Sequence, residues 1–150
     1  MLEFLPYLTF RLDIYMKTKA TLELSDVKSM AAAAEAEALK HGWAVSIAIV
    51  DDGGNLKWFQ RLDGAAPISA HIAPAKARTS ALGMRESKIY EEMINGGRMS
   101  FLSAPGLEGM LEGGVPIMKD GQCLGAVGVS GVKSSEDAQV ARAGIAAIGL

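Results

Sequence analysis

The feature of this sequence that most constrains its fold is a glycine-rich, β-branched segment in its C-terminal third. The segment contains GGVPI at positions 113–117 and GAVGVSG at positions 125–131. Glycine inside a strand costs stability unless the backbone turns, bulges or approaches another group closely. We therefore expect two paired strands, with bare backbone beside Ser130 that meets a ligand or a facing subunit.

Hydrophobic spacing and turn residues predict the order of the other elements. Short turns join neighbouring strands, so we expect a mainly antiparallel sheet flanked by helices, an α+β fold. The predicted elements are a helix after an N-cap at Ser25 that ends by Gly42, strands over 45–50 and 56–61, a helix over 68–82 that contains Pro74, a short helix over 87–94, a loop-rich stretch over 99–109, one or two strands within 110–118, a strand over 123–130, and a helix over 135–148 capped by Ser134.

Composition limits the function classes. The chain has 150 residues, of which 49% are hydrophobic, as in an ordinary single globular domain. Its net charge of −2 and its scattered lysines and arginines predict neither a nucleic-acid partner nor a membrane surface. The single cysteine, Cys123, excludes an intrachain disulfide, and its strand setting predicts a small buried hydrophobe. A cytoplasmic location fits this cysteine usage.

The N-terminal residues differ from the rest. Met1 to Tyr15 is apolar, yet Glu3 and Pro6 interrupt it, so it is too short and too broken to span a membrane. Two interpretations stay open: an upstream start that lengthens the chain, or an apolar arm that packs on a neighbouring subunit. We take residues 1–21 as an N-terminal extension and residues 22–150 as the domain.

Only two histidines are present, His41 and His71. His41 falls in the last turn of the first predicted helix, where a surface role is expected. His71 lies at the start of the second, close in sequence to Arg61 and Asp63. It has no histidine partner at ligand spacing, so we predict no metal-ion site, whereas axial ligation of haem iron needs only one such residue.

Arg61, Asp63, Lys76 and Arg78 form the densest mixed-charge region of the chain. One interpretation is an exposed cluster of ion pairs that contributes little stability. The other is an anion clamp, in which Arg61 holds a carboxylate bidentately and Lys76 adds a second positive charge. In the second case, we expect Arg61 and Lys76 to converge on one pocket with residues 128–131.

Several separated motifs occur in order along the chain: VDDGGNL at 50–56, RLDGA at 61–65, KARTS at 76–80, GGVPI at 113–117, and GAVGVSG at 125–131 followed by Asp137. Together these motifs resemble the GlcG/HbpS family, which includes the C-terminal domain of PduO-type proteins. The resemblance covers about residues 22–150 and implies a small profilin-like domain that forms homo-oligomers. Some members of that family are haem-binding or redox-sensing proteins, one is fused to a corrinoid adenosyltransferase, and others accompany catabolic pathways.

Three hypotheses about function follow. The first is a homo-oligomeric small-molecule-binding protein of the GlcG/HbpS type, with haem as the candidate cofactor. The second is a small catabolic enzyme of the lyase or isomerase class, which acts on a carboxylated or aromatic metabolite through Arg61, Lys76 and His71. The third is a purely structural oligomer. The candidate ligand-binding residues are Arg61, Asp63, His71, Lys76, Gly128, Ser130 and Gly131.

Overall fold

The computed structural model of the chain describes residues 15–150. The two interpretations of the apolar N-terminal arm therefore concern residues that lie almost wholly outside the described part. Residues 15–21, the rest of the predicted extension, are exposed and form neither helix nor strand. Contacts between this segment and the domain include the pairing of Lys19 with Asp52 and a hydrogen bond from the Gln122 side chain to the Thr18 carbonyl at 3.2 Å.

Four strands and four α-helices make up the domain, together with one 3-10 helix in the loop-rich stretch. Predicted and observed boundaries agree within a few residues, and the stretch over 110–118, where one or two strands were expected, holds one. The elements are α1 (Leu24–Lys40), β1 (Ser46–Asp51), β2 (Leu56–Arg61), α2 (Ser69–Gly83), α3 (Ser87–Asn95), η1 (Met99–Ser103), β3 (Gly114–Lys119), β4 (Gln122–Ser130) and α4 (Ser134–Ala146).

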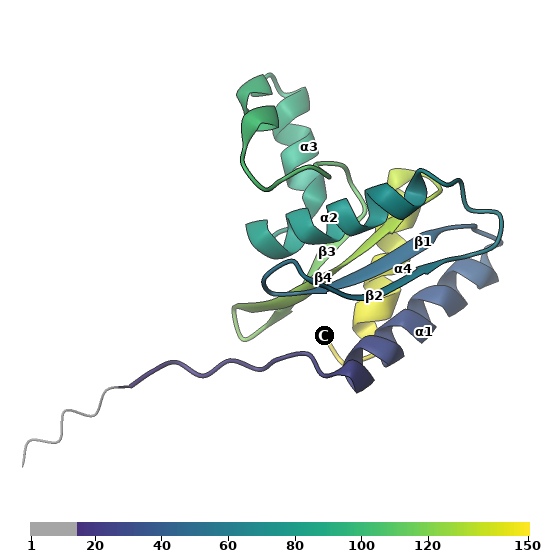
Figure 1. The fold of residues 1–150 in the computed structure, drawn as a ribbon, viewed down its shortest axis with the longest axis horizontal. Helices are drawn as coiled ribbons and strands as arrows, with labels where there is room; N and C mark the ends of the chain where they lie inside the picture. The colour runs from purple at the N-terminus through teal and green to yellow at the C-terminus, as the bar shows by residue number, and fades with distance from the viewer. Residues whose placement is uncertain (1–14) are drawn as a thin grey trace, which may run out of the picture.

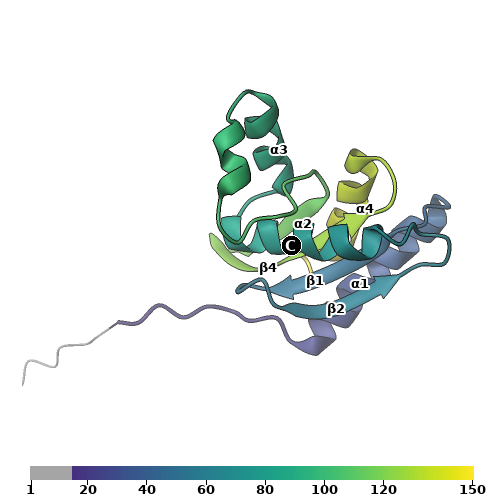
Figure 2. The same ribbon diagram turned by 45° about the horizontal axis from the view of Figure 1, so that its top comes forward.

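The strands form one antiparallel sheet in the order β2-β1-β4-β3, which confirms the predicted α+β fold. Figure 1 shows α1 and α2 on opposite sides of this sheet. The large aliphatic side chains of the sheet pack with α1 and α4, whereas α2 packs on a row of small side chains. α3 and η1 project beyond α2, away from the sheet (Figure 2). The result is a central sheet with helices on both faces.

The face of the sheet under α2 is built from small residues. Ala73, Ala77 and Ala81 of α2 pack there on Ala48, Val50 and Ala126 of the sheet. Gly128 pairs with Ala48, and a Cβ atom at Gly128 would lie 2.2 Å from the Ala73 carbonyl oxygen. The glycine is thus needed for the close approach of a helix, so the bare backbone that we expected to meet a ligand is covered by α2 at this position.

Two predicted helix caps were wrong. α1 begins at Leu24, before Ser25, and the Glu23 N–H donates to the Asp26 carboxylate at 2.9 Å. α4 includes Ser134 and is preceded by Lys133, whose N–H donates to Glu136 at 3.3 Å. In both helices an acidic side chain in the first turn accepts from the backbone N–H of the residue just before the helix, as in a capping box, and that residue rather than the serine is the N-cap.

Candidate functional site

Two predicted site residues, Arg61 and Ser130, lie in one row across the sheet with Ser46 between them. Ser46, at the start of β1, pairs with Arg61 at the end of β2 and with Ser130 at the end of β4. Side chains directly opposite each other in an antiparallel sheet share a face. Arg61, Ser46 and Ser130 therefore all face α2, with Arg61 and Ser130 about 10 Å apart because one strand separates them.

α2 begins directly over this row. The Ser46 and Ser69 hydroxyl oxygens lie 2.8 Å apart, and both side chains are buried. Ser69 donates its proton to the Ala66 carbonyl at 2.6 Å, so Ser46 is the donor in the bond between the two hydroxyls. This link fixes the first turn of α2 to the first residue of β1. The sequence carried no signal for it, because the two serines are far apart in the chain and belong to no motif.

His71 lies two residues beyond Ser69, in the first turn of α2, and its side chain is exposed. The link between Ser46 and Ser69 therefore places the first turn of α2, which carries His71, at the same end of the sheet as exposed Arg61. Two apolar side chains accompany them: Ile68, which is 60% exposed, and Phe59, which is 38% exposed and pairs with Ala48 on the α2 face. We call Phe59, Arg61, Ile68 and His71 the α2 rim.

Lys76 is placed differently from Arg61. Its side chain is buried, with only 3% of the residue exposed. The ammonium donates to the Val129 carbonyl at 2.9 Å and to the Asp137 carboxylate at 3.0 Å. Lys76 thus reaches the end of β4 as predicted, but its charge is matched there by Asp137, and Arg61 remains outside on the exposed rim.

Asp137 completes a link among three elements. Its other carboxylate oxygen accepts from the Val132 N–H at 3.1 Å, just before α4 begins. Burial raises the pKa of this carboxyl, while the neighbouring Lys76 acts to lower it. The pair joins α2, β4 and the start of α4, so its evident role is to hold these elements together.

The remaining predicted site residues, Gly131, Ser130 and Asp63, have different surroundings. A Cβ atom at Gly131 would lie 2.4 Å from the Ala44 carbonyl oxygen, so this glycine allows close backbone packing. Ser130 is 7% exposed. Exposed Asp63 lines a cavity of about 290 Å³ beside the C-terminal end of α1, together with Trp43 and Leu62.

His41 has the structural role that its position predicts. Its Nε2 atom lies 2.9 Å from the Glu37 carboxylate one turn earlier in α1, and its ring stacks on Trp43 with the centroids 4.3 Å apart. Hydrogen bonds from Gln139 and His41 lower the pKa of Glu37. Because His41 is already engaged on both its ring face and its Nε2 atom, His71 is the histidine better placed to meet a ligand.

Two features of the described residues bear on the kind of site and setting. Residues 15–150 bring together no group of three or more histidine, cysteine, aspartate or glutamate side chains that could hold a metal ion. In the same part of the chain, no helix is both long enough and apolar enough to cross a bilayer.

Comparison with known proteins places the chain in a family. Residues 22–146 match the family described as "Haem degrading protein HbpS-like". Protein GlcG of Escherichia coli K12 is 55% identical over 115 residues, which are 77% of this chain and 85% of GlcG. A double mutant of Streptomyces reticuli HbpS has a similar structure, with a TM-score of 0.80, 31% identity and coverage of 90% of this chain and 92% of that one. A structure of PduOC in complex with haem has a TM-score of 0.77 and 27% identity, over 87% of this chain and 96% of that one. The chain therefore belongs to the HbpS-like family, as its motifs indicated.

Proposed function

We propose that this protein binds haem at the α2 rim, with His71 as the axial ligand of the iron and Arg61 as the partner of a propionate. The observation that carries the proposal is the pairing of Ser46 with Arg61 and its hydrogen bond to Ser69, which together bring Arg61 and exposed His71 to one end of the sheet. The similarity to PduOC, a protein solved in complex with haem, supports haem as the ligand.

The chemistry of the α2 rim fits a haem group. A neutral imidazole is a common axial ligand of haem iron. The guanidinium of Arg61 fits a carboxylate in a bidentate fork, and such charge-assisted bonds are among the stronger ones in proteins. Exposed Phe59 and Ile68 offer apolar surface to the porphyrin ring. When bound, haem would supply redox-active iron, and the residues of the rim would position it and anchor its propionates.

His71 is also favoured over His41 as the axial ligand of the iron. The chain has two histidines, His41 and His71. His41 is held by Glu37 and Trp43. His71 can present a ring nitrogen to iron without giving up such contacts, so we assign the axial position to it.

The enzymatic alternative has less support from the geometry. It used Lys76 as a second positive charge toward an anionic substrate, but the ammonium is buried against Asp137 and the Val129 carbonyl. Arg61 and His71 alone can bind and orient a carboxylate. We therefore propose binding without turnover, by a protein that assembles with copies of itself.

The role of Arg61 is tested by comparing haemin with its dimethyl ester, whose propionates are capped. In titrations followed by absorbance, Arg61→Gln should bind haemin about ten-fold more weakly than the wild type does, because one charge-assisted hydrogen bond to a propionate is lost. The ester should bind both proteins equally. Equal haemin affinity in the two proteins would contradict the contact between Arg61 and a propionate.

A further inference from the structure

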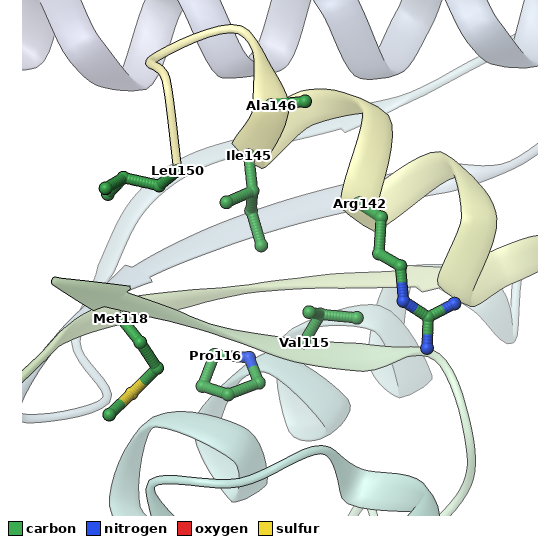
Figure 3. A pocket seen from close by; sticks show the side chains of 7 residues that line it. All are labelled: Val115, Pro116, Met118, Arg142, Ile145, Ala146 and Leu150. Carbon is green, nitrogen blue, oxygen red and sulfur yellow. The ribbon is translucent and has the colours of Figure 1, made fainter. Parts of the chain in front are cut away.

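A second cavity lies between the edge strand β3 and the C-terminal part of α4, away from the residues of the α2 rim. Its volume is about 410 Å³, within the range of small-molecule sites. Figure 3 shows Ile145 pointing from α4 toward β3, with Arg142 and Leu150 at opposite ends of the cavity. The lining residues are Val115, Pro116, Met118, Arg142, Ile145, Ala146 and Leu150.

The lining combines an apolar wall with one cation. All lining side chains except Arg142 are apolar, and Val115 and Ile145 are buried. Arg142 is half-exposed, and its Nη2 atom donates to the Glu86 carboxylate at 2.8 Å. A guanidinium carries several N–H donors in a planar fork, so donors other than this one remain for a second carboxylate. Such a wall with a cation at one end fits an apolar molecule that carries a single acidic group.

The edge of β3 indicates what kind of occupant fits. The Val129 N–H donates to the Gly113 carbonyl at 3.0 Å, so this carbonyl points toward β4. In an antiparallel pair the direction of the backbone groups alternates along the strand, so those of Gly114 and Pro116 point away from β4, outward from the edge of the sheet. Ser87 accepts from the outward Gly114 N–H at 2.8 Å, and Pro116 has no N–H to offer. An added β-strand would lack these donors. The occupant is therefore a small molecule that uses the side chains of the cavity.

We infer that this cavity binds a small aromatic or branched aliphatic monocarboxylate. The carboxylate lies on the Arg142 guanidinium beside Glu86, and the hydrocarbon part packs on Val115, Pro116 and Ile145. This site is independent of haem binding at the α2 rim, since the two sites share no residue.

The test uses 2-naphthoate as the probe and the neutral 2-naphthamide as its matched control. Isothermal titration calorimetry of the full chain should give saturable binding of 2-naphthoate and at least about ten-fold weaker binding of the amide, because the charge-assisted bond to Arg142 is lost. Equal affinities for the two probes, or no binding of 2-naphthoate at millimolar concentration, would overturn the inference.

Two substitutions at one ion pair should act in opposite directions. Arg142→Gln should weaken 2-naphthoate binding about ten-fold and leave the affinity for 2-naphthamide unchanged. Glu86→Gln removes the competing carboxylate and should strengthen 2-naphthoate binding several-fold, a gain that a folding defect cannot produce. If both variants bind 2-naphthoate as the wild type does, Arg142 is not the anchor and the inference fails.

A third variant tests the position of the ligand. Ala146 lines the cavity and is exposed, so Ala146→Trp fills the space without disturbing the core. This variant should lose 2-naphthoate binding and keep the haemin affinity of the wild type. Retained 2-naphthoate binding would contradict the site. A wild type that fails to bind haemin but binds 2-naphthoate would refute only the proposal for the α2 rim.

Discussion

At the scale of single residues, Lys76 and Asp137 show how the fold holds a buried charge pair. The ammonium lies 3.0 Å from the carboxylate, and both side chains are almost wholly buried. Replacing Lys76 by Met leaves Asp137 buried without its counter-charge. We expect a loss of about 3–5 kcal/mol in the free energy of unfolding, measured by urea denaturation.

Two further variants control this measurement. Lys40 is exposed at the end of α1, so Lys40→Met should change stability by less than about 0.5 kcal/mol. The double variant Lys76→Met with Asp137→Leu removes both charges and should recover part of the loss, because the unpaired carboxylate is gone. If Lys76→Met costs no more than Lys40→Met, the pair does not support the fold as described.

Cys123 gives a prediction about pH. The thiol is buried in β4, and burial raises the pKa of this group. A raised pKa keeps a thiol neutral at pH values at which an ordinary cysteine, with a pKa of about 8.5, has begun to ionise. Because the thiolate is the reactive form, alkylation by iodoacetamide at about pH 8.5 should be at least ten-fold slower in the folded protein than in urea. Equal rates would show that the thiol is accessible and ionised.

At the scale of elements, the sequence predicted the helices, strands and hairpins well because local rules set them. The run of alanines with buried positions at helical spacing marks α1, and the Asp51–Asn55 turn marks the β1–β2 hairpin. The proximity of Lys76 to Asp137 and of Ser46 to Ser69 could not be predicted in this way. Both depend on how α2 crosses the sheet, and that follows from small side chains contributed by separate elements.

The candidate site, like the elements, could be predicted from the sequence only in part. Arg61 and His71 were identified from their residue types and neighbours in the chain, and both are exposed at one end of the sheet. Gly128 was expected to leave backbone bare for a ligand or a facing subunit, and in the structure its missing side chain admits α2. Phe59 and Ile68 were missed, since apolar residues beside a strand end or a helix start usually enter the core, and only the tertiary structure shows that they are exposed.

The close approach of α2 to β4 can be tested at Gly128. A methyl group there would meet the Ala73 carbonyl at 2.2 Å and the Ala77 backbone nitrogen at 2.5 Å, so Gly128→Ala must displace the helix. We expect a destabilisation of at least about 1–3 kcal/mol by urea denaturation. Gly96 is exposed at the end of α3 with an ordinary φ of −76°, and the nearest atom to a Cβ there would be the Glu92 carbonyl oxygen at 3.2 Å, so Gly96→Ala should cost much less than Gly128→Ala. Similar costs at both positions would contradict the packing described.

At the scale of the whole molecule, the distribution of exposed apolar side chains favours self-association. Large apolar residues are exposed on β2, at the start of α2 and after its end, as Leu56, Ile68 and Met84 illustrate. Exposed side chains of this size are candidates for contact with another subunit. We predict that the protein is at least a dimer, so light scattering at micromolar concentrations should give twice the monomer mass of 15.8 kDa or more. A monomer mass throughout that range would refute the prediction.

The central claim is that the α2 rim binds haem through His71. The measurement that tests it most directly is an absorbance titration with haemin of the wild type, His71→Ala and His41→Ala. We predict a saturable, shifted Soret band in the wild type and in His41→Ala, because His41 is held by Glu37 and Trp43. In His71→Ala this band should be lost, while the circular dichroism spectrum stays the same as that of the wild type. The same Soret titration in His71→Ala as in the wild type would contradict the assignment.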